Sequence, residues 1–263
     1  MTQRPRRPLV LTYHAIGDVP LTRDWYRLFV TPDDIRRHVG RLRTWGYSIV
    51  TFGTLAAAVR DGDARGLAAL TFDDGFADNA TVLPGLLHEL GAVATTFVIS
   101  GWLGDVHPDA PWARIATADQ VRAMHDAGIE IGAHTVSHVD LTKLDDAAAF
   151  DQLATSKRQL EEIVDAPVEV AADPFGSTNE TVADACRAAG FVAACGTRGR
   201  GSWAEPLNLP RQDIGNRQTR LGFFLKRDGL YEPAMKPLAP LIKSPPGRLA
   251  VKVIRRLREA GRA

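Results

Sequence analysis

Two adjacent aspartates, Asp73 and Asp74, end an apolar run in the stretch LTFDDGF, residues 70–76. The residues before them have the composition of a short buried strand, and Gly75 after them favours a turn. Carboxylates that ionise beside a low-dielectric core are costly unless a cation or hydrogen-bond donors compensate them. The pattern therefore indicates that these two charges have a partner.

Two histidines, His134 and His138, stand four residues apart after another apolar run, in GAHTVSH, residues 132–138. A single helical turn or a tight loop would present both imidazoles on one side. One carboxylate and two histidines are a common ligand set for a catalytic divalent metal, because three protein ligands leave a position for water. An aspartate pair alone can be a turn cap and a histidine pair alone can be solvated, but together they favour a metal site.

The elements that would position these groups follow a repeated pattern in which a helix ends at a glycine and a strand follows. Gly46, Gly91, Gly128 and Gly190 each close a helical segment and precede a strand-like run. Strands that alternate with helices predict a parallel sheet covered by helices, either closed into a barrel or left as an open doubly wound sheet. In both architectures functional groups collect at the carboxyl ends of the strands.

Four strand ends bring titratable groups to that rim. The runs LVLTYH, LAALTFDD, IEIGAH and LNLPRQD place there His14, the aspartate pair, His134 and Arg211. Four other histidines fall in helix or loop patterns away from the rim, and we interpret them as structural or solvated: His38, His88, His107 and His125.

Composition is that of an ordinary globular protein, with 263 residues, 45% of them hydrophobic, and a formal net charge of +1, so it gives no ground for nucleic-acid binding. Cys186 and Cys195 are too few for a disulfide framework or a zinc ribbon, and we interpret them as buried small hydrophobes. The basic N-terminus has too short an apolar stretch for a signal peptide, and no run is long and apolar enough to span a membrane. We therefore expect a cytoplasmic protein.

Three segments together resemble the first motifs of the polysaccharide deacetylase family, also called the NodB-homology domain or carbohydrate esterase family 4. They are TFDDG at 71–75, HTVSH at 134–138 and the Pro-Phe-Gly of ADPFGS at 172–177. The similarity covers residues 9–215, between a basic tail at 1–8 and an extension at 216–263. It implies a single-domain α/β fold, a deformed (β/α) barrel. It also implies hydrolysis of an N-acetyl group from an amino sugar with one divalent metal, most often zinc, with cobalt or nickel as alternatives.

The resemblance implies roles for particular residues. Asp74, His134 and His138 would bind the metal. Asp73 would be the general base, because it stays free to take a proton from the attacking water, whose pKa a metal lowers towards 7. The oxyanion would be bound in the turn Pro174-Phe175-Gly176, through the backbone N–H of Phe175, since proline has none.

Two features depart from the best-known members of the family. Ala172 stands where they have an arginine that orients the base, and no histidine follows His138 to act as the general acid. Arg211 is similar to an arginine of the subgroup whose third motif also lacks arginine, and could contact Asp73. His14 could be the acid if its strand lies next to that of Asp73.

The extension contains the basic amphipathic stretch RLAVKVIRRLREAGRA, residues 248–263. It is consistent with a helix packed on the barrel or with a helix lying on an anionic membrane surface, and both interpretations remain open.

The leading hypothesis is a metal-dependent deacetylase of an N-acylated amino sugar or glycoconjugate precursor. One alternative is a deformylase or another amide hydrolase of the same fold. An alternative of another class is a carbohydrate-binding barrel without catalysis. The sequence does not specify the acyl group, the sugar, the native metal or the oligomeric state.

Overall fold

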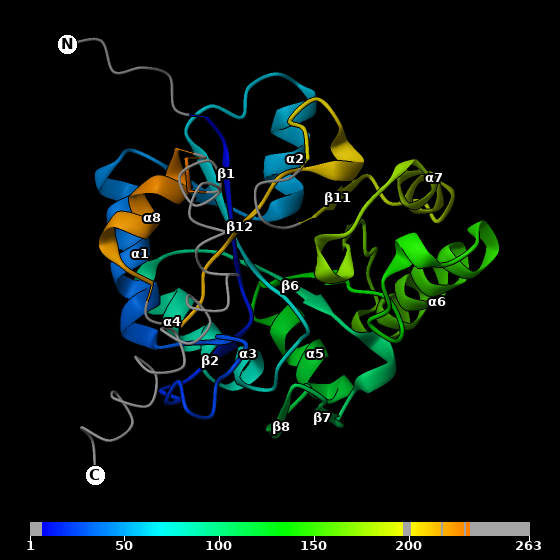
Figure 1. Ribbon diagram of the computed structural model, residues 1–263, viewed down its shortest axis with the longest axis horizontal. Helices are drawn as coiled ribbons and strands as arrows, with labels where there is room; N and C mark the ends of the chain where they lie inside the picture. Colours follow the sequence, from blue (N-terminus) through cyan, green and yellow to red (C-terminus); the bar gives the residue numbers. More distant parts are fainter. Residues whose placement is uncertain (1–6, 197–200, 217, 229, 232–263) are drawn as a thin grey trace, which may run out of the picture.

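The computed structural model describes residues 7–196, 201–216, 218–228, 230 and 231 (Figure 1). Within these residues, eight strands form one sheet with parallel pairing throughout, in the order β11-β10-β9-β6-β5-β1-β12, and β4 pairs with β5 beside this path. The strands are β1 (Leu9–Tyr13), β4 (Ser48–Val50), β5 (Leu67–Phe72), β6 (Thr95–Val98), β9 (Glu130–Ala133), β10 (Val170–Ala172), β11 (Ala193–Cys195) and β12 (Gln212–Asp213).

The sheet curls towards a barrel. Strands β4 and β6 pair with successive parts of the same strand, β5. At the other side, the segment 209–214 contacts both β11 and β1. Leu209 forms a parallel bridge with Cys195 of β11, and the N–H of Ile214 donates to the carbonyl of Thr12 in β1. The prediction of a deformed (β/α) barrel is confirmed. The sheet is not the open doubly wound sheet that the strand and helix pattern also allowed.

Helices surround the sheet (Figure 1). They are α1 (Pro32–Thr44), α2 (Phe52–Arg60), α3 (Asp78–Thr81), α4 (Leu83–Leu90), α5 (Ala118–Asp126), α6 (Asp146–Val164), α7 (Glu180–Ala188) and α8 (Arg220–Arg227). Short 3₁₀ turns lie at Ser100–Trp102, Leu141–Lys143, Pro174–Gly176 and Pro206–Asn208. Two further strand pairs stand apart from the sheet: β2 (Ala15–Ile16) with β3 (Phe29–Val30), and β7 (Val106–His107) with β8 (Ala110–Arg114).

Helix ends follow local chemistry. Thr31 caps α1 in a reciprocal capping box with Asp34, and Thr117 does the same for α5 with Gln120. Gly91 ends α4 in the left-handed conformation that glycine adopts without steric cost.

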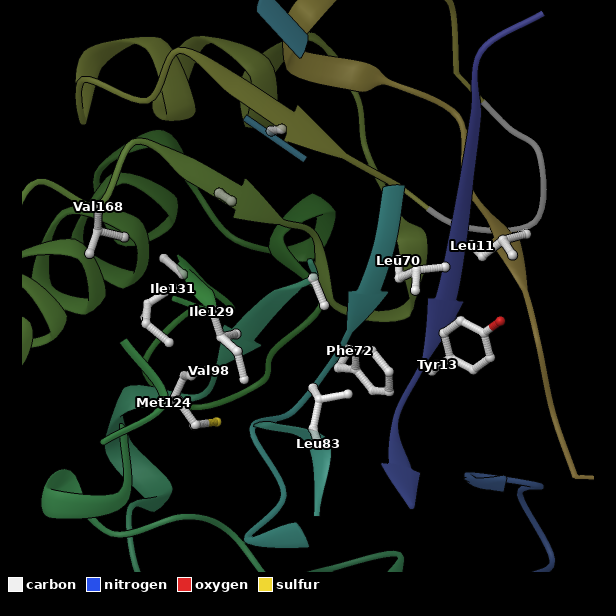
Figure 2. Close-up of a cluster of buried hydrophobic side chains, with 14 of the residues drawn as sticks. Leu11, Tyr13, Leu70, Phe72, Leu83, Val98, Met124, Ile129, Ile131 and Val168 are labelled. Atoms are coloured by element: carbon white, nitrogen blue, oxygen red, sulfur yellow. The ribbon is translucent and has the colours of Figure 1, made fainter. Parts of the chain in front are cut away.

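Alternation along β1 and β5 separates the two faces of the sheet. Leu11 and Tyr13 of β1 lie beside Leu70 and Phe72 of β5 in the core that faces the helices, and the rings of Tyr13 and Phe72 stack with centroids 5.1 Å apart (Figure 2). Thr71 falls between Leu70 and Phe72 and therefore points to the inner face. Asp73, the first residue after β5, is two residues beyond Thr71 and therefore also points to the inner face.

The inside of the barrel is apolar below this rim. A second buried cluster includes Val10 of β1, Phe97 of β6, Ala172 of β10 and Leu209, and α2 contributes Phe52. Charged groups at the rim therefore stand above a low-dielectric interior, where an unpaired charge is costly.

Residues 248–263, for which a basic helix is predicted, lie outside the described residues, as does most of the extension. Its described part includes α8, where Phe223 stacks on His38 of α1 and on Trp45, the residue that follows α1. Among the helices of the described residues, none has the length and apolarity that crossing a bilayer requires. Cys186 and Cys195 are free and buried, as predicted.

Candidate active site

Asp73 is buried and paired with Arg211. The guanidinium Nη1 lies 2.7 Å from Oδ1 of Asp73 and Nη2 lies 2.8 Å from Oδ2, which is a bidentate arrangement. Arg211 is held in turn by the carbonyl of Gly196, 2.7 Å from Nε, and by the hydroxyl of Thr71, 3.1 Å from Nη1. The contact expected between Arg211 and the candidate base is present.

This pair fixes the charge of Asp73. Burial alone would raise the pKa of Asp73, but the positive charge and hydrogen bonds of Arg211, together with His134, outweigh burial and lower the pKa. Asp73 is therefore ionised at neutral pH. Arg211, directly before β12, thus contacts Asp73, while Ala172 stands where the resemblance implies an arginine that orients the base.

Asp74, His134 and His138 converge on one point. Oδ1 of Asp74 lies 3.5 Å from Nε2 of His134 and 3.5 Å from Nε2 of His138. Candidate ligand atoms of all three residues lie within 4.8 Å of one another. Ligand atoms around a tetrahedral zinc stand about 3.4 Å apart, because each is about 2.1 Å from the metal. The spacing of the three atoms therefore fits a small divalent cation.

The protonation of the site supports the same conclusion. Nδ1 of His134 lies 2.7 Å from the carbonyl oxygen of Ala172, and because that oxygen can only accept, Nδ1 carries the proton. The neutral ring then turns the lone pair of Nε2 towards Asp74, whose buried Oδ1 has no hydrogen-bond partner among the described residues. Two electron pairs that face each other in a buried site require a cation between them.

The two histidines differ in the pKa that their surroundings give them. For His134, burial would lower the pKa, but the close contact with Asp74 and the negative charges of both aspartates raise it. For His138, burial and the charge of His134 lower the pKa to about 4. The two aspartates therefore favour a cation at Nε2 of His134, either a proton or a metal ion, and His138 is a neutral imidazole that can bind a metal.

A tight loop, not a helical turn, holds the second histidine. The side-chain oxygen of Gln152, on α6, accepts hydrogen bonds from the N–H groups of Val136 and Ser137 at 3.2 and 3.1 Å. The hydroxyl of Thr135 accepts from the N–H of His138 at 3.0 Å. These contacts stabilise a conformation that local propensity alone does not favour.

Strained backbone gathers at this site. Six described residues other than glycine have positive φ, and four of them belong to the site: Asp74, Thr135, His138 and Phe175. Such conformations are costly for residues with a Cβ and persist where the surrounding structure imposes them. Their clustering supports the assignment of the site.

The Pro174–Gly176 turn borders the cluster. Phe175 has φ 60° and is 59% exposed, and its ring centroid lies 4.8 Å from that of His138. The turn thus lies beside the candidate ligand His138, and Pro174 and Gly176 are buried.

A cavity of about 580 Å³ opens over these groups, and His14 lines it together with Asp73, Asp74, His134, His138 and Phe175. His14 directly follows β1, which pairs with β5, and the carbonyl of Tyr13 accepts a hydrogen bond of 2.9 Å from the N–H of Asp73. The adjacency of the two strands on which the role of His14 depends is therefore present.

The interpretation of His107 as lying away from the rim is wrong. His107 ends β7, lines the same cavity and is buried, with Nε2 3.4 Å from Oδ2 of Asp74. No local pattern in GDVHPDAPW distinguishes this histidine, because a hairpin that packs back over the rim brings it there. His38 is structural as predicted, with Nδ1 3.1 Å from the hydroxyl of Tyr13.

Asp173, which follows β10, is a further buried acid for which the sequence motifs indicate no role. Its carboxyl is buried, neither oxygen has a hydrogen-bond partner among the described residues, and burial raises its pKa to about 7.

A curled parallel barrel with an aspartate pair and two histidines at the carboxyl ends of its strands defines a protein of the NodB-homology class. The chain belongs to the polysaccharide deacetylase family, whose sequence profile matches residues 61–194.

Three relatives illustrate the likeness. YxkH of Bacillus subtilis (strain 168) is 26% identical over 192 residues, which are 72% of this chain and 64% of YxkH. The polysaccharide deacetylase BC0361 of Bacillus cereus superposes with a TM-score of 0.69 at 26% identity, over 85% of this chain and 69% of BC0361. The Streptococcus pyogenes deacetylase PplD, solved with acetate, has the same fold, with a TM-score of 0.72 at 24% identity over 85% of this chain and 99% of PplD. The chain thus spans about two thirds of the length of YxkH and of BC0361.

Proposed function

We propose that this protein is a metal-dependent deacetylase that hydrolyses the N-acetyl group of an amino sugar or glycoconjugate. One observation carries the proposal. A three-residue cation site, formed by Asp74, His134 and His138, stands directly beside an ionised carboxylate, Asp73, that Arg211 holds in place. Membership of the polysaccharide deacetylase family supports the same reaction.

A divalent cation bound by these three residues would polarise the amide carbonyl and make water more acidic; zinc suits the ligand set, and cobalt or nickel are alternatives. Asp73 takes the proton of the attacking water, and the two hydrogen bonds from Arg211 keep its carboxylate from rotating away. The bond from water oxygen to the acyl carbon forms as this proton leaves.

The remaining steps fall to groups on the cavity wall. The backbone N–H of Phe175 donates to the oxyanion that develops on the former carbonyl oxygen. His14 gives a proton to the departing nitrogen as the C–N bond breaks, which yields a free amine and a carboxylate. His14 suits this role because it lines the same cavity as Asp73 and is only partly buried.

Aromatic rings at the cavity support a carbohydrate as substrate. Tyr26 and Phe175 both line it, and their side chains are 64% and 59% exposed. Exposed rings beside a polar site are suited to stack on the apolar face of a sugar.

The two alternative functions, a non-catalytic carbohydrate-binding barrel and a deformylase, differ in the residues that they require at the site. A carbohydrate-binding barrel without catalysis has no use for an ionised base beside the cation ligands, so the pairing of Asp73 with Arg211 favours the enzyme. A deformylase would use the same residues.

A cytoplasmic location, with peripheral membrane contact through residues 248–263, stays a proposal that fractionation of cells expressing the tagged protein would test.

The test is proton NMR of small acids released when the zinc- or cobalt-loaded protein meets N-acetyl and N-formyl amino sugars, offered free, nucleotide-linked and lipid-linked. Acetate from the wild type and none from Asp73→Asn would establish the deacetylase. Formate alone would identify a deformylase. No acid from any sugar, with the metal shown to be bound, would overturn the proposal.

A further inference from the structure

We propose that His107 is a positioning residue that holds the carboxylate of Asp74 in its metal-binding orientation. Nε2 of His107 lies 3.4 Å from Oδ2 of Asp74, while the other oxygen of this carboxylate, Oδ1, faces His134 and His138. Oδ1 of Asp74 therefore faces the cation site, and Oδ2 faces His107.

The tautomer of His107 follows from its second nitrogen. The backbone N–H of Asp109 donates to Nδ1 of His107 at 3.1 Å, so Nδ1 is an acceptor and the proton of the neutral ring is on Nε2. Nε2 has no hydrogen-bond partner among the described residues, and it lies 3.4 Å from Oδ2 of Asp74. The ring therefore holds one unpartnered N–H donor beside the carboxylate of Asp74.

Packing fixes the plane of the ring. His107 stacks on Phe76 with ring centroids 4.9 Å apart, and its edge meets Trp102 with centroids 5.7 Å apart. The side chain is buried, so it has little freedom to turn away from Asp74.

The hairpin that carries His107 is itself attached to the turn after Asp74. The N–H of Ala116 donates to the carbonyl of Gly75 at 2.8 Å, and the N–H of Ala77 donates to the carbonyl of Arg114 at 2.8 Å. Phe76 forms an antiparallel bridge with Ile115 between these two bonds. The hairpin and the aspartate turn therefore form one rigid unit.

His107 is not a fourth ligand. Among the described residues, the group whose candidate ligand atoms all lie within 4.8 Å of one another contains only Asp74, His134 and His138. Groups that hydrogen-bond a metal-ligating carboxylate orient it, and their loss commonly weakens metal binding about 10- to 100-fold. Asp74 depends on such support because its backbone is in the strained region, with φ 70°.

The inference rests on the proposed metal site, and its first test is cation affinity, measured by competition for Zn²⁺ with a chromophoric chelator. His107→Phe keeps an aromatic ring and removes the donor, and His107→Gln restores an N–H donor. We expect His107→Phe to bind Zn²⁺ about 10- to 100-fold more weakly, and His107→Gln to recover most of the loss. The visible absorption of the Co²⁺-loaded protein should change in His107→Phe and return towards that of the wild type in His107→Gln.

His88→Phe is the matched control, because His88 is exposed on α4, and it should leave affinity and spectrum unchanged. Wild-type affinity and an unchanged Co²⁺ spectrum in His107→Phe would overturn the inference. So would a loss that is equal in His107→Phe and His107→Gln, since it would point to packing alone.

A further test uses the wild-type protein and therefore does not depend on whether a variant folds. Nitrogen-15 NMR of the histidine rings in the metal-free protein should show His107 with its proton on Nε2 at neutral pH, and a proton on Nδ1 would overturn the inference. If the wild type binds neither Zn²⁺ nor Co²⁺, the proposed metal-dependent function fails, while the tautomer still decides whether His107 supports Asp74.

Discussion

Arg211 and Asp73 face each other in a bidentate pair although 138 residues separate them along the chain. Asp73 directly follows β5, Arg211 directly precedes β12, and β1 lies between these two strands in the sheet. Each side chain compensates the buried charge of the other, so neither would be stable alone at this depth.

Arg211→Ala should therefore destabilise the protein by about 3 to 5 kcal/mol, because it leaves the Asp73 carboxylate buried without its cation. It should also raise the pKa of Asp73, so that the acid limb of the pH dependence of kcat/KM moves to higher pH. Urea unfolding and a pH-rate profile measure the two effects. Arg187→Ala, at an exposed ion pair with Asp184, should change stability by less than about 0.5 kcal/mol. An acid limb that does not move would contradict the role given to Arg211.

Zinc should stabilise the folded protein through the three candidate ligands. At a free concentration one hundred times its Kd, a ligand that binds only the native state adds about 2.7 kcal/mol to the free energy of unfolding. We expect thermal unfolding to shift upward with Zn²⁺ and back when a chelator is added, and His134→Ala to lose this response. His125→Ala, a change on α5 outside the cluster, should keep the full response. A zinc response of normal size in His134→Ala would argue against this metal site.

The loop that carries His138 depends on Gly101. A Cβ at this position would lie 2.4 Å from the carbonyl oxygen of Val136, to which the N–H of Gly101 donates at 2.9 Å. Because backbone cannot yield as a side-chain end does, we expect Gly101→Ala to destabilise by about 1 to 3 kcal/mol and to weaken zinc binding.

Gly85→Ala is its counterpart on α4, where a Cβ meets nothing within 4 Å. It should stabilise the protein by up to about 1 kcal/mol, because alanine favours helix. Equal effects of the two changes on urea unfolding would show that the contact with Val136 is unimportant.

Asp173 gives the stability of the protein a particular pH dependence. Burial raises its pKa from 3.8 to about 7, so between these values the native state holds a proton that the unfolded state has released. Stability from this group therefore falls as pH rises from about 4 to about 7 and is level above that. Asp173→Asn removes the penalty, and we expect it to be more stable than the wild type by about 2 to 4 kcal/mol at pH 8, with little difference at pH 4.

Urea unfolding between pH 4 and pH 8, with a chelator present, measures this difference. Asp184→Asn, on the exposed surface of α7, should show no such trend. A difference between Asp173→Asn and the wild type that is constant with pH would mean that Asp173 is ionised in the folded protein throughout this range.

Local sequence specifies those features of this protein that involve residues close together along the chain. The capping boxes at Thr31 and Thr117 involve groups within a single helical turn, so local chemistry specifies them. The alternation of LTFDD sets which face of the strand each side chain takes, and this alone brings Asp73 to the inner rim. Short motifs at strand ends likewise indicate a site of one carboxylate with His134 and His138, and the family resemblance implies that Asp74 is that carboxylate.

The partners that stabilise and orient these groups come from distant segments and depend on the folded sheet. Arg211 was a candidate, but its bidentate geometry depends on the bridge between Leu209 and Cys195 and on the pairing of β12 with β1, which set the position of the residue before β12. His107 was misinterpreted because nothing within its own segment distinguishes it from a solvated loop histidine. Its position depends on the hairpin hydrogen-bonding to the turn after Asp74, a contact between segments more than thirty residues apart. Local propensity cannot encode such contacts, since packing and burial fix them only when the whole sheet has formed.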